Sequence, residues 1–219
     1  MENLLQIDSI QKSFGERKIL RSVYLESRTG NITALLGRNG SGKSSLFQIV
    51  MGKLATEDKA VSINGQSFYY ARHPHRLLTF LPQNFHIPKR LRIIQVFRNF
   101  GLPFEICFKK FPELIGRKQE RLASLSSGER RLIEVLVVIF TQSLFTILDE
   151  PFSQLMPIHI EKIKEILLEE KKRKGFIITD QIYETVMDIS DLTYLLTNGV
   201  VKSVMDKTEL IREGYVNRL

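Results

Sequence analysis

Residues 37–44 read GRNGSGKS, and this stretch decides how the rest of the chain is interpreted. It matches the pattern G-x-x-x-x-G-K-[S/T] at every fixed position. Glycines at this spacing let backbone N–H groups turn inward around phosphate oxygens, and a helix that begins directly afterwards adds the positive end of its dipole. A Gly-rich structural turn is the alternative. A phosphate site is favoured because the stretch also follows a buried apolar run and precedes an apolar-periodic one.

The residue types in this phosphate loop indicate individual roles. Lys43 is expected to reach the β- and γ-phosphates of a nucleotide, and the Ser44 hydroxyl is expected to hold Mg²⁺. The nucleotide-binding residues predicted for the loop are Gly37, Arg38, Asn39, Gly40, Ser41, Gly42, Lys43, Ser44 and Ser45.

A second stretch, TILDEPFSQLMP at residues 146–157, supplies the acids that a phosphate loop needs. Its apolar run ends in Asp149 and Glu150, and a proline follows. Taken alone, the stretch fits an ordinary acidic turn at the end of a strand. Beside a phosphate loop, we expect Asp149 to position Mg²⁺ from its outer sphere and Glu150 to act as the base that polarises the attacking water.

Strands alternate with helices along most of the chain, which predicts an α/β fold with a mostly parallel sheet and right-handed crossovers. Residues 4–10 and 19–26 alternate apolar and polar, as two antiparallel strands do. Further strands are expected at Ile32–Leu36, in KAVSING, LLTFLPQ, LFTILDE and GFIITD, and in a closing hairpin of LTYLLTNG and VVKSVM. Helices are expected over about 43–51, from near 126, over 157–174 and over 183–187.

The pattern changes between residues 88 and 125, where short basic helices with Phe and Pro replace the strands. We expect a small helical subdomain to be inserted here. The chain is then one domain over 1–219, with a nucleotide-binding core at 1–87 and 132–219 and a helical subdomain at 88–131. The charge run EEKKRK at 169–174 is interpreted as the solvated end of a helix.

The composition is that of a globular protein and leaves several functions open. Of the 219 residues, 43% are hydrophobic and 26% are charged, and the net charge is +8. A basic excess suits nucleic acid, anionic phosphates or a membrane face, so charge alone does not decide among them. A single cysteine, Cys107, excludes an intrachain disulfide, and neither a signal peptide nor an apolar stretch of ~20 residues is visible. The histidines have no metal-ligand spacing.

Three further stretches occur in an order that resembles the ATP-binding cassette (ABC) family. LSSGERR at 125–131 resembles its LSGGQ signature, LPQ at 81–83 resembles its Q-loop, and Phe14 in KSFG stands where the family places an aromatic ring against adenine. With the phosphate loop and ILDEP, these motifs follow the family order over the full length. The resemblance is to the nucleotide-binding subunit of an ABC transporter, and the strings are most similar to those of the lipopolysaccharide-export and branched-chain amino-acid-import ATPases.

The resemblance implies the P-loop NTPase fold: a RecA-like, mostly parallel sheet flanked by helices, an N-terminal antiparallel β subdomain and the inserted helical subdomain. It implies ATP and Mg²⁺ as ligands, with Ser44, Gln83 and Asp149 around the metal. Two copies would pack head to tail, so that each nucleotide lies between one chain's phosphate loop and the other chain's signature. The signature residues expected to act across the dimer are Ser126, Ser127, Gly128 and Glu129.

Three positions depart from the family pattern. Ser127 replaces the first signature glycine, Met156 stands where an acid helps to couple the two sites, and Gln181 replaces a histidine after the last core strand. Methionine accepts hydrogen bonds weakly, and an amide can donate one to a γ-phosphate but carries no charge. We therefore expect intact ATP binding with slow hydrolysis, and we expect Glu150 and Gln181 to be the catalytic residues.

The function implied by the resemblance is ATP hydrolysis that powers a separate transmembrane permease subunit through ATP-driven dimerisation of two identical chains. The protein would lie in the cytoplasm, on the inner face of the cell membrane, and would bind no nucleic acid. A soluble non-transport ABC ATPase, or an ATP-binding regulator with little turnover, is the alternative. The long coiled-coil insertions and tandem cassettes of DNA-repair and translation-factor members are absent from the sequence.

Overall fold

Within the described residues 2–68, 76–105 and 109–216 of the computed structural model, the central sheet has six strands in the order β10-β9-β3-β8-β7-β6. All but β10 run parallel, as predicted. The strands are β3 (Ile32–Leu36), β6 (Leu78–Leu81), β7 (Phe145–Asp149), β8 (Gly175–Thr179), β9 (Leu192–Thr197) and β10 (Val200–Val204). Every residue of β3, β7 and β8 is buried, as expected for parallel strands that are covered on both faces.

A second, antiparallel sheet is built mainly from the N-terminal residues. Its strands lie in the order β2-β1-β4-β5. They are β1 (Leu4–Phe14), β2 (Arg17–Arg28), β4 (Asp58–Ile63) and β5 (Gln66–Ser67). The predicted strand pair at 4–10 and 19–26 is confirmed, and both strands are longer than expected. Because β1 extends this far, Phe14 is its last residue.

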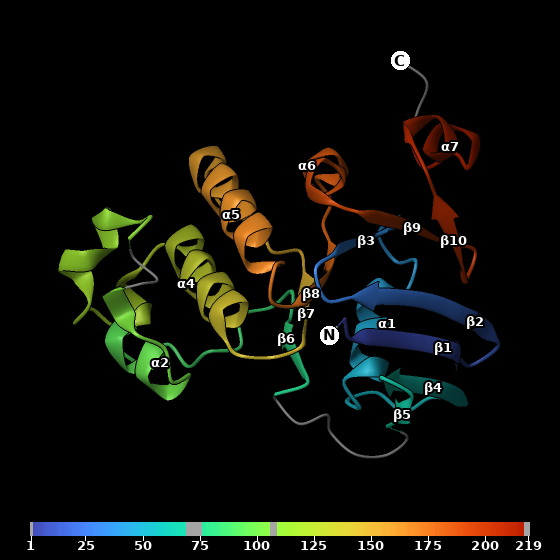
Figure 1. Ribbon diagram of the computed structural model, residues 1–219, viewed down its shortest axis with the longest axis horizontal. Helices are drawn as coiled ribbons and strands as arrows, with labels where there is room; N and C mark the ends of the chain where they lie inside the picture. Colours follow the sequence, from blue (N-terminus) through green and yellow to red (C-terminus); the bar gives the residue numbers. More distant parts are fainter. Residues whose placement is uncertain (1, 69–75, 106–108, 217–219) are drawn as a thin grey trace.

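Two hydrophobic cores lie on opposite faces of the central sheet. Helix α1 (Lys43–Val50) fills the space between the two sheets, where Phe47 packs in one cluster with Leu5 of β1 and Ile177 of β8. The other face is covered by α4 (Ser127–Phe140), α5 (Pro157–Glu170) and α6 (Tyr183–Ile189). Figure 1 shows α4 and α5 side by side on this face and the antiparallel strands at the opposite end of the molecule.

The segment predicted to be a helical subdomain is helical and packs onto α4. It contains α2 (Ile93–Asn99) and two short 3-10 helices, η1 (Pro112–Arg117) and η2 (Leu122–Ser124). Phe97 of α2 and Leu114 of η1 are buried in the same cluster as the apolar residues of α4. This cluster ties the segment to the core.

The structure corrects three details of the sequence interpretation. The expected boundary between residues 131 and 132 falls inside α4, so the signature and the core share one continuous helix. Helix α5 ends at Glu170 rather than at residue 174, and a further short helix, α7 (Lys207–Arg212), follows the closing hairpin. Cys107, His73 and His75 lie outside the described residues. In the part of the chain that the structure describes, no helix is both long enough and apolar enough to cross a membrane.

Candidate nucleotide-binding site

The phosphate loop connects the carboxyl end of β3 to α1, as the sequence predicts. Gly42 has φ 109° and precedes the helix, and a Cβ there would lie 2.8 Å from the Ile19 side chain of β2. Only glycine fits a left-handed backbone in such close contact. The Lys43 amine donates to the carbonyls of Gly37 at 2.5 Å and Arg38 at 3.2 Å, so the lysine holds the loop in a closed curve around its own side chain.

Asp149 ends β7 and faces the start of α1. Its carboxylate accepts a hydrogen bond from the Ser44 hydroxyl, and only 2% of the residue is exposed. Burial raises the pKa of Asp149, while the Ser44 hydrogen bond and the nearby Lys43 charge oppose the shift. Burial likewise lowers the pKa of Lys43, and the charges of Asp149 and Glu150 oppose that shift. The charges of Lys43 and Asp149 therefore support one another.

Glu150 is held in an unusual backbone conformation at the end of the same strand. Its φ is 53°, in the left-handed region that a residue with a side chain seldom adopts. The Glu150 N–H donates to the Thr179 carbonyl of β8 at 2.8 Å. The Gln181 amide donates to both carboxylate oxygens of Glu150, at 3.2 and 3.3 Å. In this conformation the carboxylate meets Gln181, the second residue after the end of β8.

A cavity of about 300 Å³ brings most of the predicted site residues together. Phe14 contributes an aromatic ring from the end of β1, and the residue is 51% exposed. Ile19 was not predicted and lies in the wall, where its side chain meets Gly42. The lining residues are Phe14, Ile19, Asn39, Gly40, Gly42, Lys43, Ser44, Ser45, Gln83, Glu150 and Gln181. Gly37, Arg38, Ser41 and Asp149 are not in its wall, and Arg38 and Ser41 line a neighbouring cavity instead.

The signature residues lie outside the cavity of their own chain. Ser126 caps α4: its hydroxyl accepts from the Glu129 N–H, and the Glu129 carboxylate accepts from the Ser126 N–H. Arg117 of η1 also binds Glu129. Burial opposes ionisation of Glu129, but the hydrogen bonds from Ser126 and Arg117 outweigh it and lower the pKa. Ser126 and Ser127 are exposed, so the first turn of the helix is open to a ligand outside its own chain.

The two glycine positions of the signature differ in what they tolerate. A Cβ on Gly128 would lie 2.6 Å from the Gln154 carbonyl, so a side chain there would force the helix away from the segment after Glu150. Ser127 instead points its side chain into solvent. This placement explains why the departure at 127 is compatible with the fold.

Asp180 is a buried acid that the sequence interpretation did not single out. Its carboxylate accepts from the backbone N–H groups of Phe152, at 2.9 Å, and Ile182, at 3.1 Å. Burial raises the pKa of Asp180, and these hydrogen bonds oppose the shift. The residue therefore ties the turn after Glu150 to the turn that carries Gln181. Its position at the end of an apolar strand, as for Asp149, was the available signal.

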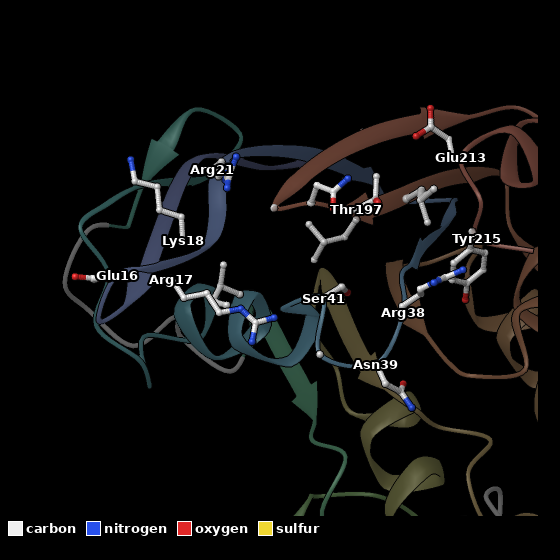
Figure 2. Close-up of a pocket in the computed structure, with 16 residues that line it drawn as sticks. Glu16, Arg17, Lys18, Arg21, Arg38, Asn39, Ser41, Thr197, Glu213 and Tyr215 are labelled. Atoms are coloured by element: carbon white, nitrogen blue, oxygen red, sulfur yellow. The ribbon is translucent and has the colours of Figure 1, made fainter.

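A larger cavity, of about 570 Å³, lies on the other flank of the phosphate loop. Figure 2 shows Arg17, Lys18 and Arg21 of β2 on one side of it and Arg38 and Tyr215 on the other. Arg38 donates to the Gly214 carbonyl at 2.5 Å. The start of the phosphate loop is thus braced by residues near the C-terminal end of the chain.

The residues available for a metal ion are oxygen donors. Among the described residues, no group of three or more His, Cys, Asp or Glu side chains is arranged to hold a metal ion by itself. The Ser44 hydroxyl donates to the Asp149 carboxylate, and Gln83 lines the same cavity as Ser44. Such a donor set fits Mg²⁺, which keeps several waters and binds through few carboxylates together with phosphate oxygens.

Comparison with known proteins gives a consistent result. The family model described as ABC transporter matches residues 20–153. The lipopolysaccharide export system ATP-binding protein LptB of Haemophilus influenzae is 26% identical over 235 residues, which cover 99% of this chain and 96% of that protein. The high-affinity branched-chain amino acid transport ATP-binding protein BraG of Pseudomonas aeruginosa is 23% identical and covers 90% of each chain.

Solved structures agree with the fold. The structure of a nucleotide-free ATP-binding cassette from an ABC transporter matches with a TM-score of 0.78, at 23% identity, over 99% of this chain and 96% of that one. A bacterial Atm1-family ABC exporter with ATP bound matches with a TM-score of 0.83, at 18% identity, over 97% of this chain and 40% of that one.

Proposed function

The chain belongs to the ABC transporter family, and from this premise we propose that it is the ATP-binding and ATP-hydrolysing subunit of a transporter. It powers a separate membrane subunit by closing into a dimer around ATP and opening after hydrolysis. The relatives named as ATP-binding proteins of lipopolysaccharide export and of branched-chain amino acid transport support this role.

The observation that carries the proposal is the meeting of a phosphate loop with two carboxylates at one edge of the sheet. Lys43 and Ser44 line the same cavity as Glu150, and Asp149 lies directly behind Ser44. A cation for the triphosphate, a hydroxyl and carboxylate for a metal ion and a base for water are the groups that phosphoryl transfer to water requires.

Each residue of this chain then has a defined task. The loop N–H groups and Lys43 bind the phosphates, and Phe14 stacks on adenine. Ser44, Asp149 and Gln83 hold Mg²⁺, which neutralises charge on the phosphate oxygens when it is bound. Glu150 orients and polarises the attacking water, and Gln181, which contacts its carboxylate, donates a hydrogen bond to the γ-phosphate.

The position of the signature supports a dimeric active form. Because Ser126, Ser127, Gly128 and Glu129 lie outside the cavity of their own chain, a second chain is needed to bring a signature to each nucleotide. The start of α4 is exposed at Ser126 and Ser127, and the N-terminus of a helix suits a γ-phosphate. We propose a dimer of identical chains, bound to a permease on the cytoplasmic face of the membrane, with no role in binding nucleic acid.

Steady-state phosphate release tests the enzymatic part of the proposal. We expect slow but measurable turnover that falls about 100-fold or more in Glu150→Gln, because the base is lost while the side chain keeps its shape. The same variant should accumulate as an ATP-bound dimer in size-exclusion chromatography. Turnover in the parent that equals turnover in Glu150→Gln would remove the claim of hydrolysis. Equal recovery from membranes and cytosol would count against the permease partner.

A further inference from the structure

Arg131 is a buried arginine whose contacts join three parts of the site. It lies in the second turn of α4 and is 1% exposed. One terminal nitrogen donates to the Pro82 carbonyl at 2.8 Å, and the other donates to the carbonyls of Asp149 at 2.7 Å and Glu150 at 2.9 Å. One side chain therefore links the signature helix, the residue before Gln83 and the two acids at the end of β7.

Packing alone does not explain an arginine at this position. Its three acceptors are backbone carbonyls rather than carboxylates, and its Nε has no hydrogen-bond partner in the described structure. Burial lowers the pKa of Arg131, and the charges of Glu134, Asp149, Asp180 and Glu150 oppose that shift. Replacing this arginine alone by an apolar side chain would leave its three carbonyl acceptors without their donor, and unpaired buried acceptors cost stability. The guanidinium must therefore provide something that a well-packed apolar residue would not.

What it provides is a fixed backbone position for Glu150. The residue is in the left-handed region with φ 53°, and such conformations persist only where the surroundings over-determine them. Its N–H donates to the Thr179 carbonyl of β8, and its carbonyl accepts from Arg131 at 2.9 Å and from the Ser153 N–H at 3.3 Å. The same guanidinium holds the carbonyl that directly precedes Gln83. A movement of α4 along its axis would therefore displace both residues together.

From this geometry we infer that Arg131 is a positioning residue which relays the state of the signature to the catalytic residues of its own chain. The inference rests on the proposed function, because the signature then grips the nucleotide bound to the partner chain. Closure over that nucleotide fixes the first turn of α4, and Arg131 transmits this position to Glu150 and Gln83.

The neighbouring Arg130 provides a matched control. It is also buried on α4, at 7% exposure, but its guanidinium lies 4.2 Å from the Phe85 ring centroid and donates to the Ile87 carbonyl at 2.7 Å. It pairs with Glu134 at 3.5 Å. None of these contacts reaches the backbone of Asp149 or Glu150. Arg130→Lys therefore tests the general effect of altering a buried guanidinium on this helix.

The experiment compares Arg131→Lys, Arg131→Met and Arg130→Lys with the parent. For each chain, ATP affinity is measured with a fluorescent analogue, kcat is measured by phosphate release, and unfolding is followed by heat. We expect both Arg131 variants to lose about tenfold or more in kcat, since small misplacements of reacting groups have such effects. Their ATP affinity should change by less than about threefold, because the phosphate loop is untouched. Arg131→Met should fold but unfold at a lower temperature than the parent, because three carbonyls lose their donor. Arg130→Lys should keep most of its kcat.

A double variant tests the relay itself. If Arg131 acts partly through Gln83, adding Gln83→Ala to Arg131→Lys should reduce kcat by clearly less than the product of the two single effects. Multiplicative effects would contradict that route.

Other outcomes overturn the inference while leaving the proposed function standing. One is kcat within about twofold of the parent in both Arg131 variants. A second is a loss of ATP affinity that matches the loss of kcat. A third is failure of both Arg131 variants to fold while Arg130→Lys folds, because Arg131 would then serve the fold rather than the site. A different result would be a parent chain that hydrolyses ATP no faster than Glu150→Gln. That result would contradict the proposed function itself, before Arg131 is considered.

Discussion

A buried lysine lies at each end of the parallel strands of the central sheet, and only one of the two lies beside carboxylates. We call these two ends the carboxyl edge and the amino edge of the sheet. Lys43 lies at the carboxyl edge, where its amine binds the carbonyls of Gly37 and Arg38. Lys174 lies at the amino edge, 1% exposed, and binds the Thr141 carbonyl at 2.6 Å and the Thr146 hydroxyl at 3.1 Å. Both amines are thus wrapped by oxygen atoms.

The difference lies in the acids that face each amine. Asp149 and Glu150 favour the charged form of Lys43. Around Lys174 burial dominates, Arg173 adds to it and only Glu170 opposes it, so the pKa of Lys174 falls to about 7. Carboxylates at strand ends favour the charged form of a buried lysine and also provide ligands for a metal ion. Hydroxyl groups and carbonyls alone give the lysine hydrogen bonds but no opposite charge, so its role there is structural. The comparison supports the proposal that the nucleotide site lies at the carboxyl ends of the parallel strands.

Substitution of Lys43 tests the carboxyl edge and should give the largest effect of the three substitutions, a loss of ATP affinity. Lys43→Ala removes the cation that faces the phosphates, so we expect ATP affinity to fall about 100-fold or more by equilibrium titration. The fold should be retained, because burial already disfavours the charged amine. Lys53→Ala is the matched control, since Lys53 is exposed and lies over the Phe80 ring, away from the cavity. Unchanged ATP affinity in Lys43→Ala would contradict the assignment of the phosphate site to the carboxyl edge.

Substitution of Lys174 tests the opposite edge through the pH dependence of stability. The folded chain gives up the Lys174 proton near pH 7, whereas the unfolded chain keeps it to about pH 10.4. Between these values the unfolded state binds more protons, so the free energy of unfolding should rise with pH, by at most about 1.4 kcal/mol per pH unit. In Lys174→Met this rise should be absent.

Urea unfolding between pH 7 and 9 measures the Lys174 effect as a difference between parent and variant. Other titrating groups are common to both chains and cancel in that difference. Lys172→Met, which alters an exposed neighbour, should keep the slope of the parent. ATP affinity should be unchanged in Lys174→Met, and a parallel loss of affinity would show that the two edges are not independent.

A positive charge added beside Glu150 should increase the rate of ATP hydrolysis, and this effect should be smaller than the two above. Gln181 contacts Glu150 through a neutral amide, and Gln181→His places an imidazolium there. We expect phosphate release to rise about fivefold at pH 6 and less at pH 8, as the ring loses its proton near its usual pKa of about 6.5. Ile182→His, at an exposed neighbouring position outside the cavity wall, should have no such effect. No gain in Gln181→His would mean that the amide does not limit turnover.

Local patterns were sufficient to predict the elements around the phosphate loop. The strand Ile32–Leu36 has the predicted bounds, and α1 and β7 differ from expectation by about a residue at an end. The two strands are mostly apolar and end just before Gly37 and at Asp149, and α1 has an apolar period between Gly42 and Gly52, so the sequence marks where these elements end. Motif spacing also indicated most residues of the cavity wall, whereas Ile19, which comes from β2 of the other sheet, belongs to no motif and was not predicted.

Long-range contacts made to backbone atoms were not predictable. Arg131 binds carbonyls 18, 19 and 49 residues away, and a carbonyl acceptor has no residue-type signature in the sequence. The run at 169–174 was expected to be solvated, which is wrong for Lys174 because the chain turns inward after α5 to begin β8. Helix α7 had a usable signal in Asp206 and Glu209, but at six residues it is too short to show a clear period.

The brace between Arg38 and Gly214 has a practical consequence for handling the protein. Trypsin cuts after arginine, and a cut after Arg212 would separate Gly214 and Tyr215 from the folded body that holds them. Every motif residue would remain in the clipped chain, yet Arg38 would have lost its acceptor at the start of the phosphate loop. Such a preparation would mimic a nucleotide-binding mutant. The mass of the intact chain should therefore be verified before any affinity for ATP is interpreted.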